Sequence, residues 1–118
     1  MSTFTLGKLS ASTDGEPVLI AATATAGTTI HTGVSGTTSF DQLMVWLTNT
    51  DTVARTVTIE YGGTTAGFLI VKALTLPASS PPIPVLTGQI INNGSVVAVF
   101  ASATNVVLAS GYIITVVP

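Results

Sequence analysis

The chain has 118 residues, of which three are basic and five acidic, and its net charge is −2. Charged residues make up 7% of the chain and hydrophobic residues 47%, whereas a typical soluble domain has about 25% charged residues. Three scattered cations cannot neutralise a nucleic-acid backbone, the lack of cysteine excludes disulfides, and no apolar run approaches the roughly 18 residues of a membrane helix. A chain with so few charged residues must have a surface poor in charge, which predicts lasting contacts with copies of the chain or with other proteins.

The first part of the chain is predicted to be extended. Residues 3–10 and 17–25 favour strands or an arm, and turn residues lie between them. We therefore expect an N-terminal arm or edge strand over residues 1–16 and a single β-sandwich domain over residues 17–118.

Two strands are predicted before residue 50. The Thr-rich segment 28–32 predicts a short strand, and segment 40–48 is apolar on both faces, as is typical of a central strand. Asp41 and Asp51 flank this central strand and are predicted to be turn or capping residues.

The next two strands are predicted to form a hairpin. Residues 56–61 alternate between apolar and polar side chains, and a Gly-rich loop of six residues separates them from the apolar segment 68–76. The segment 77–84 contains four prolines, which cannot donate to a central ladder, so it is predicted to cross over or to follow an edge.

The C-terminal part contains the strongest turn signal. Asn93-Gly94 lies between apolar runs and predicts a type I′ hairpin that joins residues 89–91 to residues 95–101. Residues 106–117 predict one long strand with a bulge at Gly111. With about eight short strands, tight turns and long crossovers, the fold is predicted to be all-β, a single β-sandwich with jelly-roll or Greek-key wiring.

The sequence offers no catalytic or metal-binding pattern. The single histidine, His31, lies in a predicted strand with no converging ligands and no nucleophile-elbow motif elsewhere, so we expect a surface or hydrogen-bonded histidine. We therefore expect no enzyme activity, no metal and no cofactor. A hydrolase would have to use His31.

Two pairs of residues on the predicted hairpin merit separate mention. Lys72 lies among apolar neighbours, and Glu60 on the preceding strand is its natural partner if the register puts both side chains on one face. We expect either this ion pair or an edge lysine that extends its ammonium into solvent, and a contact of Lys72 with another subunit is the alternative. Tyr61 and Phe68 lie at the two ends of the Gly-rich loop. Core packing is the simpler reading of both, but they are the best candidates for an interface or a glycan platform.

Several segments resemble small virion proteins of tailed bacteriophages. They are Thr28–Thr38, Leu47–Asp51, Ile59–Thr65, Leu76–Ala78, Val85–Leu86, the Asn92-Asn93-Gly94 turn and Ala101–Val106. The resemblance covers roughly residues 28–117 and rests on turn and strand signatures. It implies a jelly-roll or related sandwich that decorates or cements the capsid, commonly as trimers.

The resulting expectation is a structural virion protein, most specifically a head decoration protein that contacts itself, as a homotrimer, and the major capsid protein or another virion protein. It would be assembled in the cytoplasm of the bacterial host. The alternatives are a head-to-tail connector, a tail or fibre component, or a carbohydrate-binding module. Residues 73–118 carry no charge, so we expect this segment to be the most completely buried.

Overall fold

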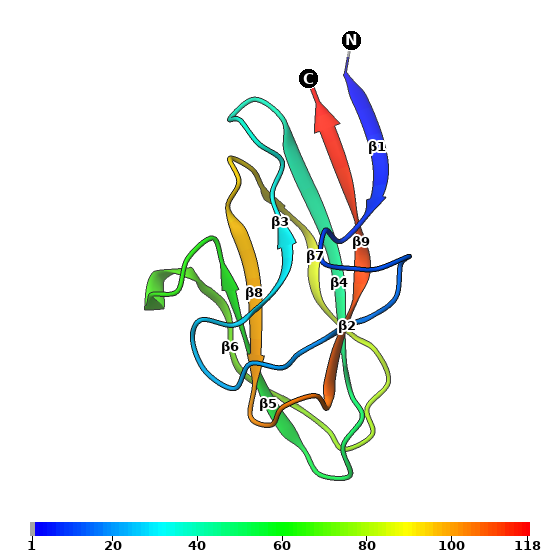
Figure 1. The fold of residues 1–118 in the computed structure, drawn as a ribbon, viewed down its shortest axis with the longest axis vertical. Helices are drawn as coiled ribbons and strands as arrows, with labels where there is room; N and C mark the ends of the chain where they lie inside the picture. The colour runs from blue at the N-terminus through cyan, green and yellow to red at the C-terminus, as the bar shows by residue number, and fades with distance from the viewer. Residues whose placement is uncertain (1) are drawn as a thin grey trace.

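The computed structural model describes residues 2–118, which form an all-β structure with two antiparallel sheets (Figure 1). The sheets pack face to face around one hydrophobic core, so the predicted β-sandwich is confirmed. The strands are β1 (Thr3–Lys8), β2 (Val18–Leu19), β3 (Thr28–Thr32), β4 (Phe40–Asn49), β5 (Arg55–Tyr61), β6 (Leu69–Leu76), β7 (Ile83–Ile91), β8 (Val96–Ala101) and β9 (Val107–Val117). A short 3₁₀ turn, η1 (Ala66–Phe68), precedes β6.

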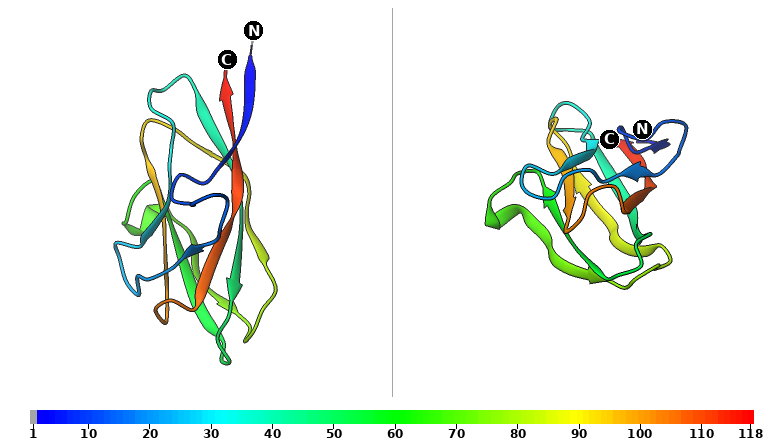
Figure 2. Two further views of the ribbon diagram at one scale, coloured as in Figure 1. Left: turned by 45° about the vertical axis from the view of Figure 1, so that its right-hand side comes forward. Right: turned by 60° about the horizontal axis from the view of Figure 1, so that its bottom comes forward.

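The strand order is that of a jelly roll. Sheet A has the order β1-β9-β4-β7, and sheet B has the order β3-β8-β5-β6. Both β1 and β2 pair with β9, on the edge that β4 leaves free, so they share one strand position. From β2 onward, consecutive strands pass from one sheet to the other, except for β5 and β6, which are neighbours in sheet B, as in the two Greek keys of a jelly roll. Figure 2 shows the two layers, with both chain ends at the same end of the sandwich.

The central strand predicted over residues 40–48 is confirmed as β4, which lies between β9 and β7. Its residues alternate strictly: Leu43, Val45 and Leu47 are fully buried, whereas the residues between them are half-buried. Alternate side chains of a strand point to opposite faces, so β4 gives one face to the core and the other to the outside of sheet A.

The hairpin and the proline-rich crossover are also confirmed. Strands β5 and β6 pair antiparallel around the Gly-rich loop. The segment 77–82 then leads from sheet B to sheet A, where Pro84 lies in β7, an edge strand. An edge strand tolerates proline because the missing N–H can face away from its single neighbour.

The predicted hairpin at Asn93-Gly94 is wrong, although the turn itself forms. Asn93 and Gly94 both have positive φ, and the Ser95 amide donates to the Asn92 carbonyl at 3.1 Å. However, β7 pairs with β4 in sheet A, whereas β8 pairs with β3 and β5 in sheet B. The tight turn therefore joins the two sheets. Local turn chemistry reverses the chain direction, but the choice of partner strands depends on the whole core.

Residues 107–117 form one continuous strand, but the bulge predicted at Gly111 is absent. The pairing of β9 with β4 runs without a register shift from Val107 to Val116. A Cβ at position 111 would collide with the carbonyl oxygen of Met44. Glycine is therefore required here by the close approach of two backbones and not by a bulge.

The core lies between the sheets, and the uncharged segment 73–118 supplies half of it. The buried cluster comprises Leu9, Val18, Ile20, Ile30, Leu43, Val45, Leu47, Val57, Ile59, Leu76, Leu86, Ile91, Val97, Val99, Ala101, Val107, Ala109 and Ile113. Within the single chain, however, Ile90 and Val117 of the same segment are exposed. The absence of charge after residue 72 thus does not produce uniform burial in one subunit.

The buried side chain of Asn49 forms hydrogen bonds that connect the two sheets at one end of the sandwich. Asn49, the last residue of β4, is fully buried, and its amide donates to the carbonyls of Val53, Leu76 and Pro77 at 3.0, 3.2 and 3.0 Å. Its side-chain oxygen accepts from the Asp51 amide at 2.9 Å. The end of β4 in sheet A is thereby connected to the end of β6 in sheet B.

Candidate functional site

The outer face of sheet A carries many apolar side chains, with the polar Gln42 between Ile114 and Ile90. Phe4, Val116 and Phe40 are cross-strand neighbours on β1, β9 and β4, and Leu6 and Ile114 continue the pattern one step along. Cross-strand partners lie on the same face of a sheet, so these rows form one surface. We call it the apolar face. It comprises Phe4, Leu6, Phe40, Met44, Trp46, Ile90, Tyr112, Ile114 and Val116.

This surface is exposed in the single chain. The exposed fractions of Phe4, Leu6 and Ile90 are 69%, 70% and 55%, and the remaining members are half-buried or exposed. At the outward strand positions of sheet A, within residues 2–118, Lys8 is the one charged residue, and it lies at the margin opposite Tyr112. An exposed apolar surface of this kind marks an interaction site.

Two aromatic side chains lie at the end of the apolar face that is farther from Phe4 and Phe40. The rings of Trp46 and Tyr112 are 6.1 Å apart between centroids and inclined by 38°. Aromatic pairs at this spacing stabilise each other, and large rigid rings are enriched at protein interfaces because they bury much area at little entropic cost. This end of the apolar face therefore carries an aromatic pair of the kind that is enriched at interfaces.

The apolar face adjoins the free edge of β1. This strand pairs only with β9, so its other edge has unpaired backbone groups, and every residue of β1 except Gly7 is exposed. The strand contains no proline, and its single charge is Lys8 at its end. An edge without these protective features can pair with a strand of another chain.

The predicted platform residues Tyr61 and Phe68 do lie together. They line a shallow cleft of about 200 Å³ with Gly67, Leu69 and Ile70. The Tyr61 hydroxyl, however, is buried and has no hydrogen-bond partner within residues 2–118. Burial, with a contribution from the charge of Asp41, raises the pKa of Tyr61 to about 12. The hydroxyl thus faces inward, and the cleft presents apolar ring surface.

The predicted ion pair between Glu60 and Lys72 is not formed. Register shifts on both sides of Ile59 pair Glu60 with Leu69, and the Ala73 amide bonds to the Thr58 hydroxyl at 3.0 Å. Lys72 is exposed, whereas Glu60 is buried. The ion pair required a register that puts both side chains on one face, and a sequence pattern does not reveal an irregular register. Lys72 is instead an exposed lysine on the edge strand β6, which is the other expectation.

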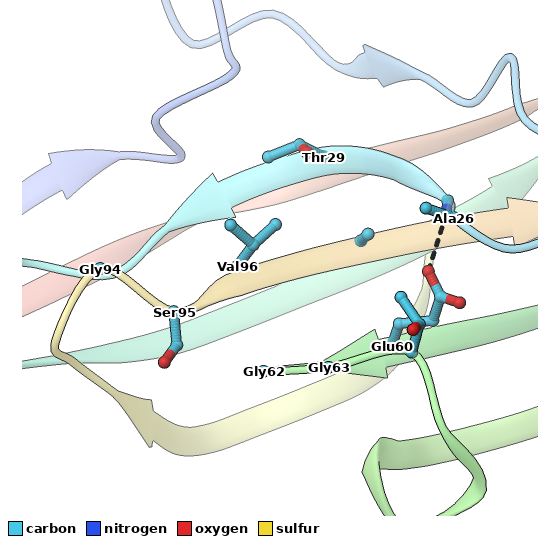
Figure 3. A pocket seen from close by; sticks show the side chains of 11 residues that line it. Ala26, Thr29, Glu60, Gly62, Gly63, Gly94, Ser95 and Val96 are labelled. Atoms are coloured by element: carbon cyan, nitrogen blue, oxygen red, sulfur yellow. Dashed lines mark hydrogen bonds between the residues drawn. The ribbon is translucent and has the colours of Figure 1, made fainter.

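Glu60 instead lies in a pocket on the outer side of sheet B, which we call the Glu60 pocket (Figure 3). Its volume is about 340 Å³, and the lining residues come from the start of β3, the end of β5 with the following loop, and the start of β8. The carboxylate accepts hydrogen bonds from the Gly27 amide at 2.7 Å and from the Thr25 hydroxyl. These partners are more than thirty residues away in sequence, so no local signal could have identified them.

His31 is a buried, hydrogen-bonded histidine between the sheets. Its Nδ1 accepts from the Ser10 amide at 2.9 Å, so the ring proton is on Nε2 and is donated to Asp41 at 2.7 Å. Asp41 also accepts from the Thr115 hydroxyl and the Val34 amide, at 2.6 and 3.0 Å. The prediction of Asp41 as a turn or capping residue is therefore wrong. Both ring nitrogens of His31 are engaged, and neither contacts a nucleophilic hydroxyl.

Asp51, by contrast, does act in a turn, as predicted. Its carboxylate bonds to the Thr52 amide at 2.7 Å and forms an ion pair with Arg55 at 2.6 Å. The Arg55 hydrogen bond, together with the Thr52 amide, holds the pKa of Asp51 below its usual value. This pair lies at the surface and stabilises the loop between β4 and β5.

No known protein family, no curated protein and no solved structure matches this chain. Within residues 2–118 no group of three or more histidine, cysteine or acidic side chains converges as metal ligands would. The same part of the chain contains no helix long and apolar enough to cross a membrane.

Proposed function

We propose that this chain is a structural protein of a tailed-bacteriophage virion, and specifically a decoration or cement protein that stabilises the head. In this proposal it assembles as a homotrimer in the cytoplasm of the bacterial host and binds the major capsid protein or another virion protein. The apolar face is the observation that carries the proposal, because an exposed, almost uncharged sheet face suits a subunit that works in an assembly. The phage assignment itself rests on the sequence resemblance.

A second copy of the chain is the occupant of the apolar face that the chemistry favours. The face offers no charge for an oppositely charged partner to match, apart from Lys8 at its margin. In a trimer this face packs against a different surface of the next subunit, because a face that meets its own copy closes a dimer, and the adjoining β1 edge can pair with a strand of the neighbour. Residues 1–16 would then contact neighbouring subunits and the capsid lattice.

The test begins with light scattering on the purified protein and continues with incubation on undecorated capsids. We expect a trimer that binds the capsids nearly equally between about 10 and 150 mM salt, since apolar burial depends little on screening. A stable monomer that ignores capsids would overturn the proposal. A steep loss of binding with added salt would contradict the apolar mechanism, and binding to necks or tails instead of heads would relocate the protein in the particle.

The cleft beside Tyr61 and Phe68 favours a second candidate, a carbohydrate-binding module. Sugars stack on aromatic rings, and Phe68 is exposed at the cleft. Glycan-array binding that is lost in Tyr61→Ala and Phe68→Ala variants would support this candidate. An array without signal would leave the cleft with a packing role only.

A further inference from the structure

Glu60 is a buried carboxylate without a cation. Its exposed fraction is 1%, and the ion pairs found within residues 2–118 involve only His31 with Asp41 and Arg55 with Asp51. The two neutral donors, Gly27 and Thr25, each bond one carboxylate oxygen. Each oxygen can accept a further bond, so capacity for a charged donor remains. A buried charge is costly unless a charge of opposite sign accompanies it.

The carboxylate reaches its donors across a neighbouring strand. Glu60 is paired with Ala98 on β8, and Ala98 is paired with Thr29 on β3. The small side chain of Ala98 leaves room for the longer Glu60 side chain, whose carboxylate accepts from the Gly27 amide. Figure 3 draws this hydrogen bond as a dashed line from Glu60 that ends beside Ala26. These residues all line the Glu60 pocket, so the carboxylate forms part of its wall.

The remaining lining has two kinds of chemistry. Val96 and Ala98 supply an apolar wall, and the hydroxyl residues Thr29, Thr64 and Ser95 line the same pocket. The volume of about 340 Å³ is at the lower end of the range for small-molecule sites. A ligand that matches this lining has a short apolar stem and one positively charged head that donates hydrogen bonds.

We propose that the Glu60 pocket binds a protonated alkyl amine, the chemistry of a lysine side chain, with the Glu60 carboxylate as its counter-ion. The methylene stem packs against Val96 and Ala98, and the ammonium donates to Glu60 and to the hydroxyls. An ammonium needs only one further bond from either carboxylate oxygen, whereas a planar bidentate guanidinium needs the remaining acceptor positions of both oxygens to face it together, beside the bonds from Thr25 and Gly27.

The proposal is tested by titrating the intact protein with Nα-acetyl-lysine methylamide, followed by heteronuclear NMR. We expect saturable shifts of the amides of Gly27 and Ser95, with a dissociation constant on the order of 1 mM. Nα-acetyl-norleucine methylamide, which has the stem without the ammonium, should bind at least about tenfold more weakly. Equal shifts with both ligands, or no shifts with either, would overturn the proposal.

Two variants and one control separate the charge from the fold. Glu60→Gln retains the shape and an acceptor for Gly27, and we expect it to weaken lysine-amide binding at least about tenfold. Val96→Phe leaves Glu60 in place but fills the pocket, and it should abolish binding even if Glu60→Gln does not fold. Glu16→Gln changes an exposed carboxylate outside the pocket and should bind as the unmodified protein does. Undiminished binding by folded Glu60→Gln or by Val96→Phe would overturn the site.

The source of the amine can be identified in the same assay. Lys8 and Lys72 form no ion pair within residues 2–118, and either could come from a second copy. If it does, the Lys8→Gln/Lys72→Gln protein lacks this competitor and binds the lysine amide more tightly than the unmodified protein. If the amine comes from elsewhere, the two proteins bind equally; both results support an ammonium site. The site lies on sheet B, so its test does not depend on assembly through the apolar face.

Discussion

The central strands β4 of sheet A and β5 of sheet B both alternate between inward and outward side chains, but their outward side chains differ in polarity and exposure. On β4 the outward residues Phe40, Met44 and Trp46 are apolar and belong to the apolar face, whereas the outward residues Gln42 and Thr48 are polar. On β5 the outward residues are all polar: Thr56 is exposed, but Thr58 and Glu60 are buried, because neighbouring segments cover them and supply hydrogen bonds. In the single chain the apolar outer residues of sheet A stay largely exposed, whereas Thr58 and Glu60 of sheet B are buried and hydrogen-bonded.

The strongest way to break this comparison is to place charges on the apolar face. We expect Phe4→Asp/Leu6→Asp to weaken self-association at least about a thousandfold, since each carboxylate would be buried unpaired in the interface. Folding should be unaffected, because both side chains are mostly exposed in the single chain. Sedimentation velocity over a concentration series measures the change.

A matched control changes two exposed apolar residues elsewhere. Val53 and Leu74 have exposed fractions of 50% and 37% and lie outside the apolar face. Val53→Asp/Leu74→Asp adds the same charge, so it should leave the association constant almost unchanged. If both double variants dissociate equally, net charge and not the apolar face governs assembly.

Much of the fold could be predicted because its signals are local. Alternating apolar and polar residues predicted the strand β5, and the apolar run predicted β4 as a central strand. The prolines before β7 predicted a crossover or an edge position. The strand partners were harder. The Asn93-Gly94 turn forms as predicted, but β7 and β8 separate into different sheets because each completes a different core layer. A turn sequence does not contain that information.

The sites were less predictable than the fold. The small number of charged residues predicted a surface that other subunits or proteins cover. Only the strand register, however, shows that Phe4, Val116 and Phe40 are cross-strand neighbours in one row of sheet A. The partner of Glu60 was predicted from regular pairing with β6, and the register shifts at Ile59 invalidate that step. Its actual donors precede β3, at a distance in sequence that no pattern covers.

A second, smaller effect is a loss of stability when the Asn49 hydrogen bonds between the two sheets are removed. Asn49→Ala removes three donated hydrogen bonds and leaves the carbonyls of Leu76 and Pro77 without this partner. We expect the free energy of unfolding in urea to fall by about 3 kcal/mol. The neighbouring Thr50→Val change, which removes one exposed hydroxyl bond to Val106, should cost about 1 kcal/mol or less. Equal losses in the two variants would show that Asn49 is not a special link between the sheets.

The smallest expected effect concerns the hydroxyl of Tyr61 on β5, which has no hydrogen-bond partner among residues 2–118. Its pKa rises from 10.0 to about 12 on folding, so the folded state favours the neutral phenol. The resulting stabilisation is present below pH 10 and is lost as the pH rises from 10 to 12, because the unfolded chain ionises first. Since the side chain is only half-buried, we expect a loss of about 1 kcal/mol.

Tyr61→Phe should remove this loss and, at neutral pH, leave stability unchanged or raise it by up to about 1 kcal/mol, since a buried hydroxyl without a partner disappears. Tyr112→Phe, on the apolar face, serves as the control and should retain the loss above pH 10. Urea unfolding at a series of pH values between 7 and 12 gives both quantities. Parallel stability curves for Tyr61→Phe and the unmodified protein would mean that the phenol is hydrated in the folded chain. In that case water reaches a polar group of sheet B, and the difference between the buried polar residues of sheet B and the exposed apolar residues of sheet A is smaller than the structure indicates.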